Sequence, residues 1–184
     1  MTTAALVLAA GEGSRFTGGT HKLVAPFRGR PLWEWAIDAA VGAGLDATYV
    51  VTGAVRLPLP AAVVEVHNDA WADGQATSLA TGIAAVREKG HDAVVVGLAD
   101  QPLVGSDAWK SVAESVATPI AVASFGGDRR PPVRLAAEVW PLLPTEGDEG
   151  ARTMMRKRPD LVTAVPCSGQ PVDIDTLEDL ERWS

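Results

Sequence analysis

The chain has 184 residues, a single cysteine and a formal net charge of −7. This length suits one domain over residues 1–184, and the lone Cys167 excludes an internal disulfide. The acidic balance argues against a nucleic-acid partner. No apolar stretch is long enough for a membrane span, and no leader precedes the first apolar run, so we expect a cytoplasmic protein without a membrane partner.

A glycine-rich turn follows the first apolar run, residues 4–9. The turn reads Gly11-Glu12-Gly13-Ser14-Arg15, and Lys22 follows it. Backbone N–H groups in such a loop can hold phosphate, and the two cations supply positive charge for a polyphosphate. The pattern is neither a P-loop nor a dinucleotide fingerprint. It predicts a triphosphate site, and a plain tight turn remains the alternative.

Nearly continuous apolar runs of strand length recur along the chain, at residues 4–9, 48–52, 63–66, 93–97, 120–124 and 161–165. Such runs are typical of strands that are buried on both faces. Helical spacing separates them in three places, at residues 32–39, 79–86 and 109–116. Pro31 suits the first turn of the first helix and Gly44 suits its end. This alternation predicts an α/β fold with a mostly parallel sheet, whose ligands bind beyond the carboxyl ends of the strands.

The pattern loosens after residue 124. The stretch Gly126-Gly127-Asp128-Arg129-Arg130-Pro131-Pro132 is expected to be a loop, because glycine and proline punctuate it. A further helix is expected over residues 149–157.

Acidic residues stand at two places that suit metal binding. Asp100 follows the apolar run at 93–97, at the edge of the sheet where the glycine-rich turn lies, and could hold Mg²⁺ against phosphate oxygens. Capping of the following turn is its alternative role. Near the end of the chain, Asp175 is explained as a helix N-cap with Glu178 as its capping-box partner. Asp173 is not explained in that way and is the candidate second metal ligand.

The segment 68–79 carries amides and hydroxyls suited to reading a base or a ribose. A polar loop in which Thr77 or Ser78 caps the next helix explains it equally well. Neither Ser14 nor Ser78 has a nearby histidine in a recognisable nucleophilic motif. A direct attack by a phosphate oxygen on a nucleotide needs none.

Five motifs together resemble the molybdenum cofactor cytidylyltransferase family, within the MobA-like NTP transferase superfamily, over nearly the whole chain. They are Leu8-Ala9-Ala10-Gly11-x-Gly13-Ser14-Arg15-Phe16 with Lys22, Asn68-Asp69-x-Trp71-Ala72-x-Gly74 with Ser78-Leu79, Ala99-Asp100-Gln101-Pro102-Leu103-Val104, Gly147-Asp148-x-Gly150-Ala151-Arg152, and Asp173-Ile174-Asp175-Thr176-x-Glu178-Asp179-Leu180.

The resemblance implies a three-layer α/β/α Rossmann-like sandwich and Mg²⁺-dependent transfer of CMP from CTP to the phosphate of molybdopterin. Arg15, Lys22 and Asp100 would be catalytic, and Asp100 and Asp173 would hold the metal. The nucleotide would be bound by Leu8, Ala9, Ala10, Gly11, Glu12, Gly13, Ser14, Arg15, Lys22, Asn68, Gly74 and Ser78. Ala10 matches the Ala-Ala-Gly loop of the cytidine branch.

The acceptor side would involve Arg129, Arg130, Asp148 and Arg152. Relatives carry a Gly-His-Pro-like motif where this chain reads Arg129-Arg130-Pro131-Pro132, and the two arginines can serve as phosphate ligands. Two alternatives stay open at this point. One is transfer from GTP or another donor to a different small phosphorylated acceptor. The other is a non-catalytic carrier that delivers molybdenum cofactor to a molybdenum hydroxylase.

Overall fold

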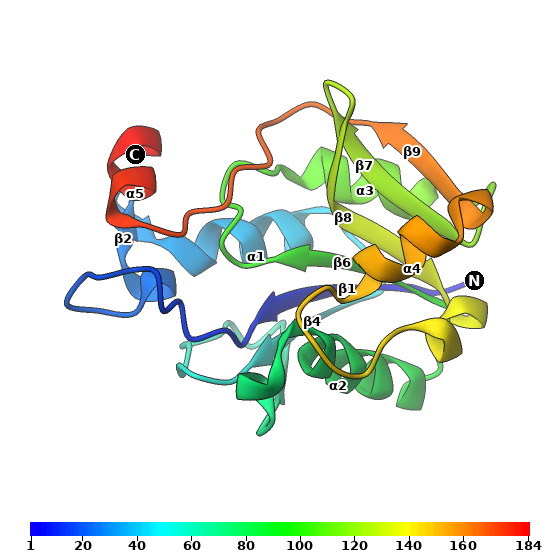
Figure 1. Ribbon diagram of the computed structural model, residues 1–184, viewed down its shortest axis with the longest axis horizontal. Coiled ribbons are helices and arrows are strands. Elements are labelled where there is room, and N and C mark those ends of the chain that lie inside the picture. The colour runs from blue at the N-terminus through cyan, green and yellow to red at the C-terminus, as the bar shows by residue number, and fades with distance from the viewer.

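A seven-stranded sheet runs through the middle of the computed structural model, which describes residues 1–184 (Figure 1). Its strand order is β5-β4-β1-β6-β8-β7-β9, and β8 alone runs antiparallel to its neighbours. The strands are β1 (Thr3–Ala9), β4 (Ala47–Thr52), β5 (Val64–His67), β6 (Ala93–Leu98), β7 (Ile120–Phe125), β8 (Asp128–Ala136) and β9 (Val162–Pro166).

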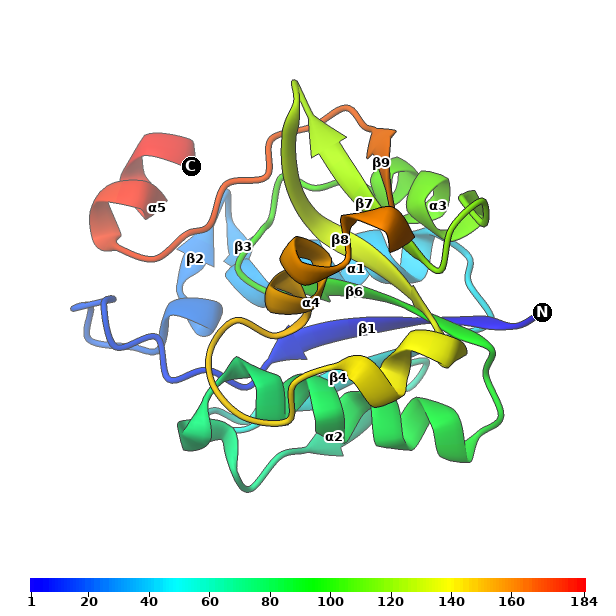
Figure 2. The same cartoon turned by 45° about the vertical axis from the view of Figure 1, so that its right-hand side comes forward.

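Helices cover both faces of this sheet (Figure 2). One layer contains α1 (Leu32–Gly42) and α3 (Ser106–Glu114). The opposite layer contains α2 (Gln75–Glu88), the 3-10 helix η3 (Ala137–Leu142) and α4 (Ala151–Lys157). The fold is thus the α/β/α sandwich with a mostly parallel sheet that the sequence predicts. None of the helices has the length and apolar character needed to cross a membrane.

Strand β1 shows why the apolar runs lack alternation. Ala5 and Val7 pack into the core on the α1 and α3 side, whereas Leu6 and Leu8 pack into the core on the α2 side. Successive side chains of a strand point to opposite faces, so a strand that is covered on both faces needs apolar residues at every position.

A small ribbon separates β1 from α1. It consists of β2 (Pro26–Phe27) and β3 (Arg30–Pro31), joined by Arg28 and Gly29 with φ of 47° and 82°. Two consecutive residues with positive φ make the kind of turn that fits the twist of a hairpin. The glycine-rich turn therefore leads into the 3-10 helix η1 (Lys22–Val24) and this ribbon before the first α-helix begins.

The expected loop over residues 126–132 is wrong. Gly126 and Gly127, with φ of 61° and 102°, form the turn between β7 and β8, and β8 already begins at Asp128. Pro131 and Pro132 lie where the pairing with β7 shifts register, between Val122 and Ala123. Prolines are accommodated at such irregularities because the ladder needs no N–H donor there, so their presence did not end the strand.

Two helix starts also differ from the expectations. Helix α2 begins at Gln75 after Gly74, so neither Thr77 nor Ser78 is its N-cap. Helix α4 begins at Ala151, two residues later than expected, and ends at the expected residue. Helix α1 begins at Leu32 as expected, but Pro31 is its N-cap and not part of its first turn. Gly44, with φ of 67°, follows its C-cap, as expected.

The last residues return across the carboxyl edge of the sheet. We call residues 167–176 the C-terminal strap. Its backbone N–H groups at Cys167 and Ile174 donate to the carbonyls of Ser124 (2.9 Å) and Asp100 (3.0 Å). Ile174 is fully buried and fastens the strap to the core. Helix α5 (Leu177–Trp183) follows and packs beside the small ribbon, where the Arg28 guanidinium donates to the Trp183 carbonyl.

Candidate active site

A pocket of about 520 Å³ opens at the carboxyl ends of β1 and β6, where the doubly wound topology places ligand sites. It contains most of the predicted nucleotide-binding residues. Its walls are formed by Leu8, Ala9, Ala10, Gly11, Glu12, Gly13, Ser14, Arg15, Lys22, Leu23, Trp71, Ala72, Gly74, Gln75, Ser78, Leu98, Ala99, Asp100 and Asp148.

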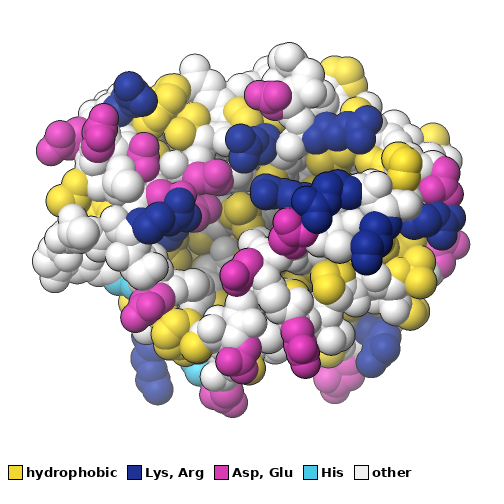
Figure 3. Space-filling model, in the orientation of Figure 1, with side chains coloured by type: hydrophobic (Ala, Val, Ile, Leu, Met, Phe, Trp, Pro, Cys, Tyr) yellow, Lys and Arg dark blue, Asp and Glu magenta, His cyan; other side chains and the backbone are white.

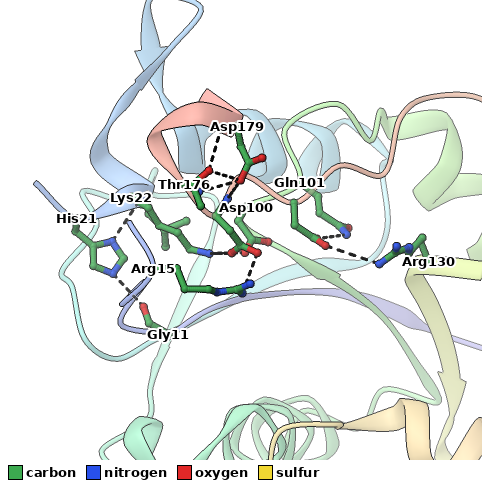
Figure 4. Close-up of polar contacts among 12 residues, drawn as sticks. Gly11, Arg15, His21, Lys22, Asp100, Gln101, Arg130, Thr176 and Asp179 are labelled. Atoms are coloured by element: carbon green, nitrogen blue, oxygen red, sulfur yellow. Dashed lines mark hydrogen bonds and ion pairs between the residues drawn. The ribbon is translucent and has the colours of Figure 1, made fainter. Parts of the chain in front are cut away.

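Two cations and two carboxylates form a compact cluster in this pocket (Figure 4). The Lys22 ammonium lies 2.7 Å from an Asp100 oxygen and 2.9 Å from an Asp175 oxygen. The other Asp175 oxygen lies 2.8 Å from the Arg15 guanidinium. Lys22 is buried, whereas the Arg15 side chain is 74% exposed. The sequence predicted three members of this cluster as catalytic, and the structure brings them together.

Burial and neighbouring charge shift the pKa values of Lys22 and Asp100 in opposite directions. Burial lowers the pKa of Lys22, but the Asp100 and Asp175 carboxylates outweigh that effect and raise it above its ordinary value. Burial raises the pKa of Asp100, and the adjacent ammonium opposes the rise. Asp100 Oδ1 is buried and has no hydrogen-bond partner. One lone-pair-bearing oxygen is therefore left unsatisfied at the centre of the site.

Gly13 allows Lys22 to reach this position. Its φ is 68°, and a Cβ added there would lie 2.9 Å from Lys22 Cγ. A larger residue would therefore be strained and would also collide with the lysine stem.

His21 organises the loop. Its Nδ1 accepts the N–H of Leu23 (3.2 Å), and its Nε2 lies 3.0 Å from the Gly11 carbonyl. Burial lowers the pKa of His21, which favours the neutral ring that accepts at Nδ1 and donates at Nε2.

The interpretation of Asp175 as a helix cap is wrong. Thr176 is the N-cap of α5, and Asp179 is its capping-box partner in place of Glu178. The helix starts one residue later than expected, so the Asp175 carboxylate is free to pair with Lys22 and Arg15. The sequence does not reveal this role, because an N-cap at either residue satisfies the same local pattern.

Asp173 lies on the other side of Ile174 in the strap. Its Oδ1 accepts a hydrogen bond from Gln101 Nε2 (2.7 Å), and its Oδ2 lies 3.8 Å from Arg130 Nη1. Gln101 is buried directly after Asp100. It belongs to the Ala99–Val104 motif, but the sequence assigned it no role. Asp173 thus contacts both Gln101, the neighbour of Asp100, and Arg130 of β8. Figure 4 shows Gln101 and Arg130 on the same side of Asp100.

Asn68 lies behind the pocket wall. Its Nδ2 donates to the hydroxyls of Thr77 (2.9 Å) and Ser78 (3.0 Å), and its Oδ1 accepts the N–H of Ala70. It holds the start of α2 in place, while Gly74 and Ser78 line the pocket themselves. Of the predicted nucleotide-binding residues, Asn68 alone is absent from the wall.

A second pocket of about 510 Å³ adjoins the first and shares Leu8, Gln75, Leu98 and Asp148 with it. Its floor is apolar, and four arginines from β8 and α4 line it. Dark blue side chains gather on this half of the molecule, beside a hollow (Figure 3). All four predicted acceptor residues line it, and Arg156 and Glu149 join them: Arg129, Arg130, Asp148, Glu149, Arg152 and Arg156.

The residues around Asp100 fit a divalent cation. The structure contains no group of three or more His, Cys, Asp or Glu side chains that would enclose a metal ion. A hard cation bound together with a polyphosphate needs only one or two protein carboxylates, since phosphate oxygens and water complete its shell. The unpartnered Asp100 oxygen is a suitable ligand, and Asp173 and Asp175 lie close enough to affect the charge on Asp100.

Comparisons with known proteins agree with this geometry. Residues 5–162 match the family model described as MobA-like NTP transferase domain. Nicotine blue oxidoreductase from Paenarthrobacter nicotinovorans is 30% identical over 96% of this chain and 94% of its own length. Purine catabolism protein PucB from Bacillus subtilis is 28% identical, over 95% of this chain and 92% of its own length.

Solved structures with the same fold include nucleotidyltransferases. A nucleotidyl transferase from Methanothermobacter superimposes with a TM-score of 0.83 at 25% identity, over 98% of this chain and 95% of that chain. Rv0371C of Mycobacterium tuberculosis, in complex with manganese, superimposes with a TM-score of 0.79 at 26% identity, over 100% of this chain and 98% of that one. With its fold, its nucleotide-sized pocket and this match over most of its length, the chain belongs to the MobA-like NTP transferase family and is a nucleotidyltransferase.

Proposed function

We propose that this protein transfers CMP from CTP to the terminal phosphate of molybdopterin and releases pyrophosphate, in a reaction that depends on Mg²⁺. The observation that carries the proposal is the pair of pockets that meet at Leu8, Gln75, Leu98 and Asp148. One is lined by the glycine-rich turn and the cluster around Asp100. The other offers arginines above an apolar floor, which suits a phosphorylated ring compound.

The reaction needs two anions to be held in line. The loop N–H groups, Lys22 and Arg15 would bind the triphosphate, and these two cations would exchange their carboxylate partners for phosphate oxygens. Arg129, Arg130 and Arg152 would hold the acceptor phosphate. An acceptor oxygen then attacks the α-phosphorus, the bond from that phosphorus to the bridging oxygen breaks, and pyrophosphate leaves with the bonding electrons.

A divalent cation on Asp100 and Asp173 would neutralise charge on the phosphates. The manganese complex of Rv0371C supports a divalent metal in this family. Within the pocket wall, Lys22 would remain charged through the reaction because its pKa is raised. Its ammonium can therefore stabilise charge that develops on the leaving group.

The donor assignment rests on Ala10 in the Ala-Ala-Gly turn. Ala10 is buried and lines the first pocket, and its carbonyl accepts the N–H of Ala54 (3.0 Å). Gly53 lies against it, since a Cβ at Gly53 would lie 2.8 Å from the Ala10 carbonyl oxygen and 2.7 Å from Trp71 Cβ. This tight packing fixes the path of the turn at Ala10. The preference for CTP itself is what the match of Ala10 to the Ala-Ala-Gly turn of the cytidine branch implies.

Pyrophosphate release tests the proposal. The purified protein is incubated with Mg²⁺ and molybdopterin, and CTP, GTP, ATP and UTP are offered in parallel. We expect release with CTP alone, only when molybdopterin is present, and none after the metal is chelated.

Other outcomes lead to specific alternatives. Release with GTP would correct the donor. CTP-dependent release with another phosphorylated acceptor, but not with molybdopterin, would correct the acceptor. A folded protein that binds the cofactor and is silent with every triphosphate would be a carrier, and its copurification with a molybdenum hydroxylase in stoichiometric amounts would support that function. One domain over residues 1–184, a cytoplasmic location and a hydroxylase as recipient of the product stay predictions.

A further inference from the structure

Helix α4 leads away from the place where the two pockets meet. Asp148 belongs to both pockets, and the loop before it is tied to α2 because the Ala76 N–H donates to the Gly147 carbonyl (2.8 Å). Three residues that follow Asp148 in the chain line the second pocket and not the first: Arg152, Arg156 and Pro159. Arg152 and Arg156 lie one helical turn apart, about 6 Å along the axis.

The end of the second pocket that is farther from the first pocket carries positive charge that the attacking phosphate does not need. The acceptor phosphate must lie where the pockets meet, in order to reach the nucleotide. Arg129 and Arg152 have no carboxylate partner, and Arg130 is 3.8 Å from Asp173. Arg156 is one turn farther out, and its guanidinium pairs with Glu149, which also accepts from Thr153.

Apolar side chains form another part of the lining of the second pocket. Leu8, Leu79, Val96, Val122 and Met155 line the same pocket. A ligand that bridges the ends would lay an apolar or aromatic body over these side chains. The Arg156 side chain is 61% exposed. Its guanidinium presents several donors in a planar fork, so it suits an anionic group that lies beside this apolar surface.

We propose that Arg156, one helical turn beyond Arg152, binds a second anionic group of the acceptor, separate from the phosphate that is nucleotidylated. The acceptor is then a molecule with negative groups at both ends of a body that has an apolar face. This inference rests on the proposed function for the identity of the second pocket as the acceptor site, and it adds a charge requirement that the transfer reaction by itself does not impose.

Binding measurements test the inference without turnover. The first pocket is filled with Mg²⁺ and a non-hydrolysable CTP analogue, and calorimetry then measures the Kd of fructose 6-phosphate and fructose 1,6-bisphosphate. Arg156→Gln is compared with Lys157→Gln, which removes the same charge from the next residue of α4. Lys157 is exposed and lies outside both pockets.

We expect the bisphosphate to bind the unaltered protein at least roughly tenfold more tightly than the monophosphate, the scale of one charge-assisted hydrogen bond. Arg156→Gln should remove this preference, Arg156→Lys should keep part of it, and Lys157→Gln should keep it in full. Equal affinity for the two sugars in the unaltered protein, or equal losses in Arg156→Gln and Lys157→Gln, would overturn the inference.

The same variants separate this inference from the proposed function. With molybdopterin and CTP, Arg156→Gln should raise the KM for molybdopterin and leave the KM for CTP and kcat nearly unchanged. If the unaltered protein shows no turnover with molybdopterin, the proposed function fails, while the calorimetric comparison still decides the role of Arg156.

Discussion

One carboxylate oxygen of Asp100 has a close charged partner, and the other has no hydrogen-bond partner. Lys22 pairs with its Oδ2, whereas its buried Oδ1 has no partner. Side chains that leave a buried oxygen unsatisfied are costly for stability, and such a cost is commonly tolerated at functional sites. The residue is therefore better explained by a ligand that binds the free oxygen than by capping of the next turn.

Asp100→Asn should lower kcat for CMP transfer by roughly 100-fold or more, since it removes a charged ligand at the reacting phosphates. The fold should persist because an amide occupies the same volume. Asp69→Asn is the matched control, as the Asp69 side chain is fully exposed. Steady-state pyrophosphate release and circular dichroism would check both variants. Normal turnover in Asp100→Asn would show that this carboxylate has no catalytic role.

Helix α5 depends on the choice of its capping residues. Asp179 accepts from the Thr176 hydroxyl and from the N–H groups of Asp175 and Thr176, which lowers its pKa below the ordinary value. A carboxyl group with a lowered pKa in the folded state stabilises that state above the pKa of the unfolded chain. The contribution is lost as the pH falls through the folded-state pKa.

Asp179→Asn should therefore reduce hydrogen-exchange protection of residues 177–183 at pH 7 and also remove the decline of protection between neutral and acidic pH. A lost cap costs about 1 kcal/mol, or roughly fivefold in protection. Glu178→Gln removes a neighbouring acid that makes no capping bond, so protection should change little. Equal effects of the two variants would point to general charge at the helix start rather than to the cap.

Strand β6 and helix α3 pack closely at Gly97, and a substitution there tests this packing. A Cβ at Gly97 would lie 2.3 Å from Trp109 Cζ2, and Trp109 is buried in the core. Gly97→Ala should lower the free energy of unfolding by about 1–3 kcal/mol, as is usual for overpacking. Gly19→Ala, at an exposed glycine whose Cβ would meet nothing within 4 Å, should have little effect. Chemical denaturation would measure the stability of both variants. Similar denaturation midpoints for Gly97→Ala and Gly19→Ala would refute the close packing.

At the scale of the whole molecule, the site depends on joining the two ends of the chain. The glycine-rich turn and Lys22 come from the first residues, Asp100 from the middle, and Asp173 and Asp175 from the strap near the last residue. The family model ends at residue 162, before this strap begins. Asp173 and Asp175 thus lie outside the matched segment, whereas Asp100 lies within it.

Two truncations test the strap. Removal of residues 168–184 should abolish turnover, because it deletes the Asp173 and Asp175 carboxylates. It should also lower Tm, because it deletes the buried Ile174 side chain and exposes the core residues that pack against it. Removal of residues 177–184 keeps Asp173, Ile174 and Asp175 and should retain measurable turnover. Pyrophosphate release and thermal melting of both proteins would be compared. If the longer truncation retained full activity, the strap would not form part of the active site.

The sequence alone determined the layers of the fold, because strands buried on both faces need unbroken apolar runs and the helices between them need a 3.6-residue pattern. It also placed the glycine-rich turn and Asp100 at one edge of the sheet, since parallel strands end at the same edge. Those were local or periodic signals, which a single chain displays without knowledge of its contacts. The other residues of the first pocket followed from the resemblance to the family.

Only the tertiary structure decided the rest. Whether Asp175 or Thr176 caps α5 depended on the salt bridges offered by Lys22 and Arg15, which lie more than 150 residues away in the chain. Strand β8 formed through Pro131 and Pro132 because β6 and β7 pair with the residues around them. Long-range pairing of this kind has no local signal, so the sequence predicted a loop and a cap where the fold required a strand and an ion pair.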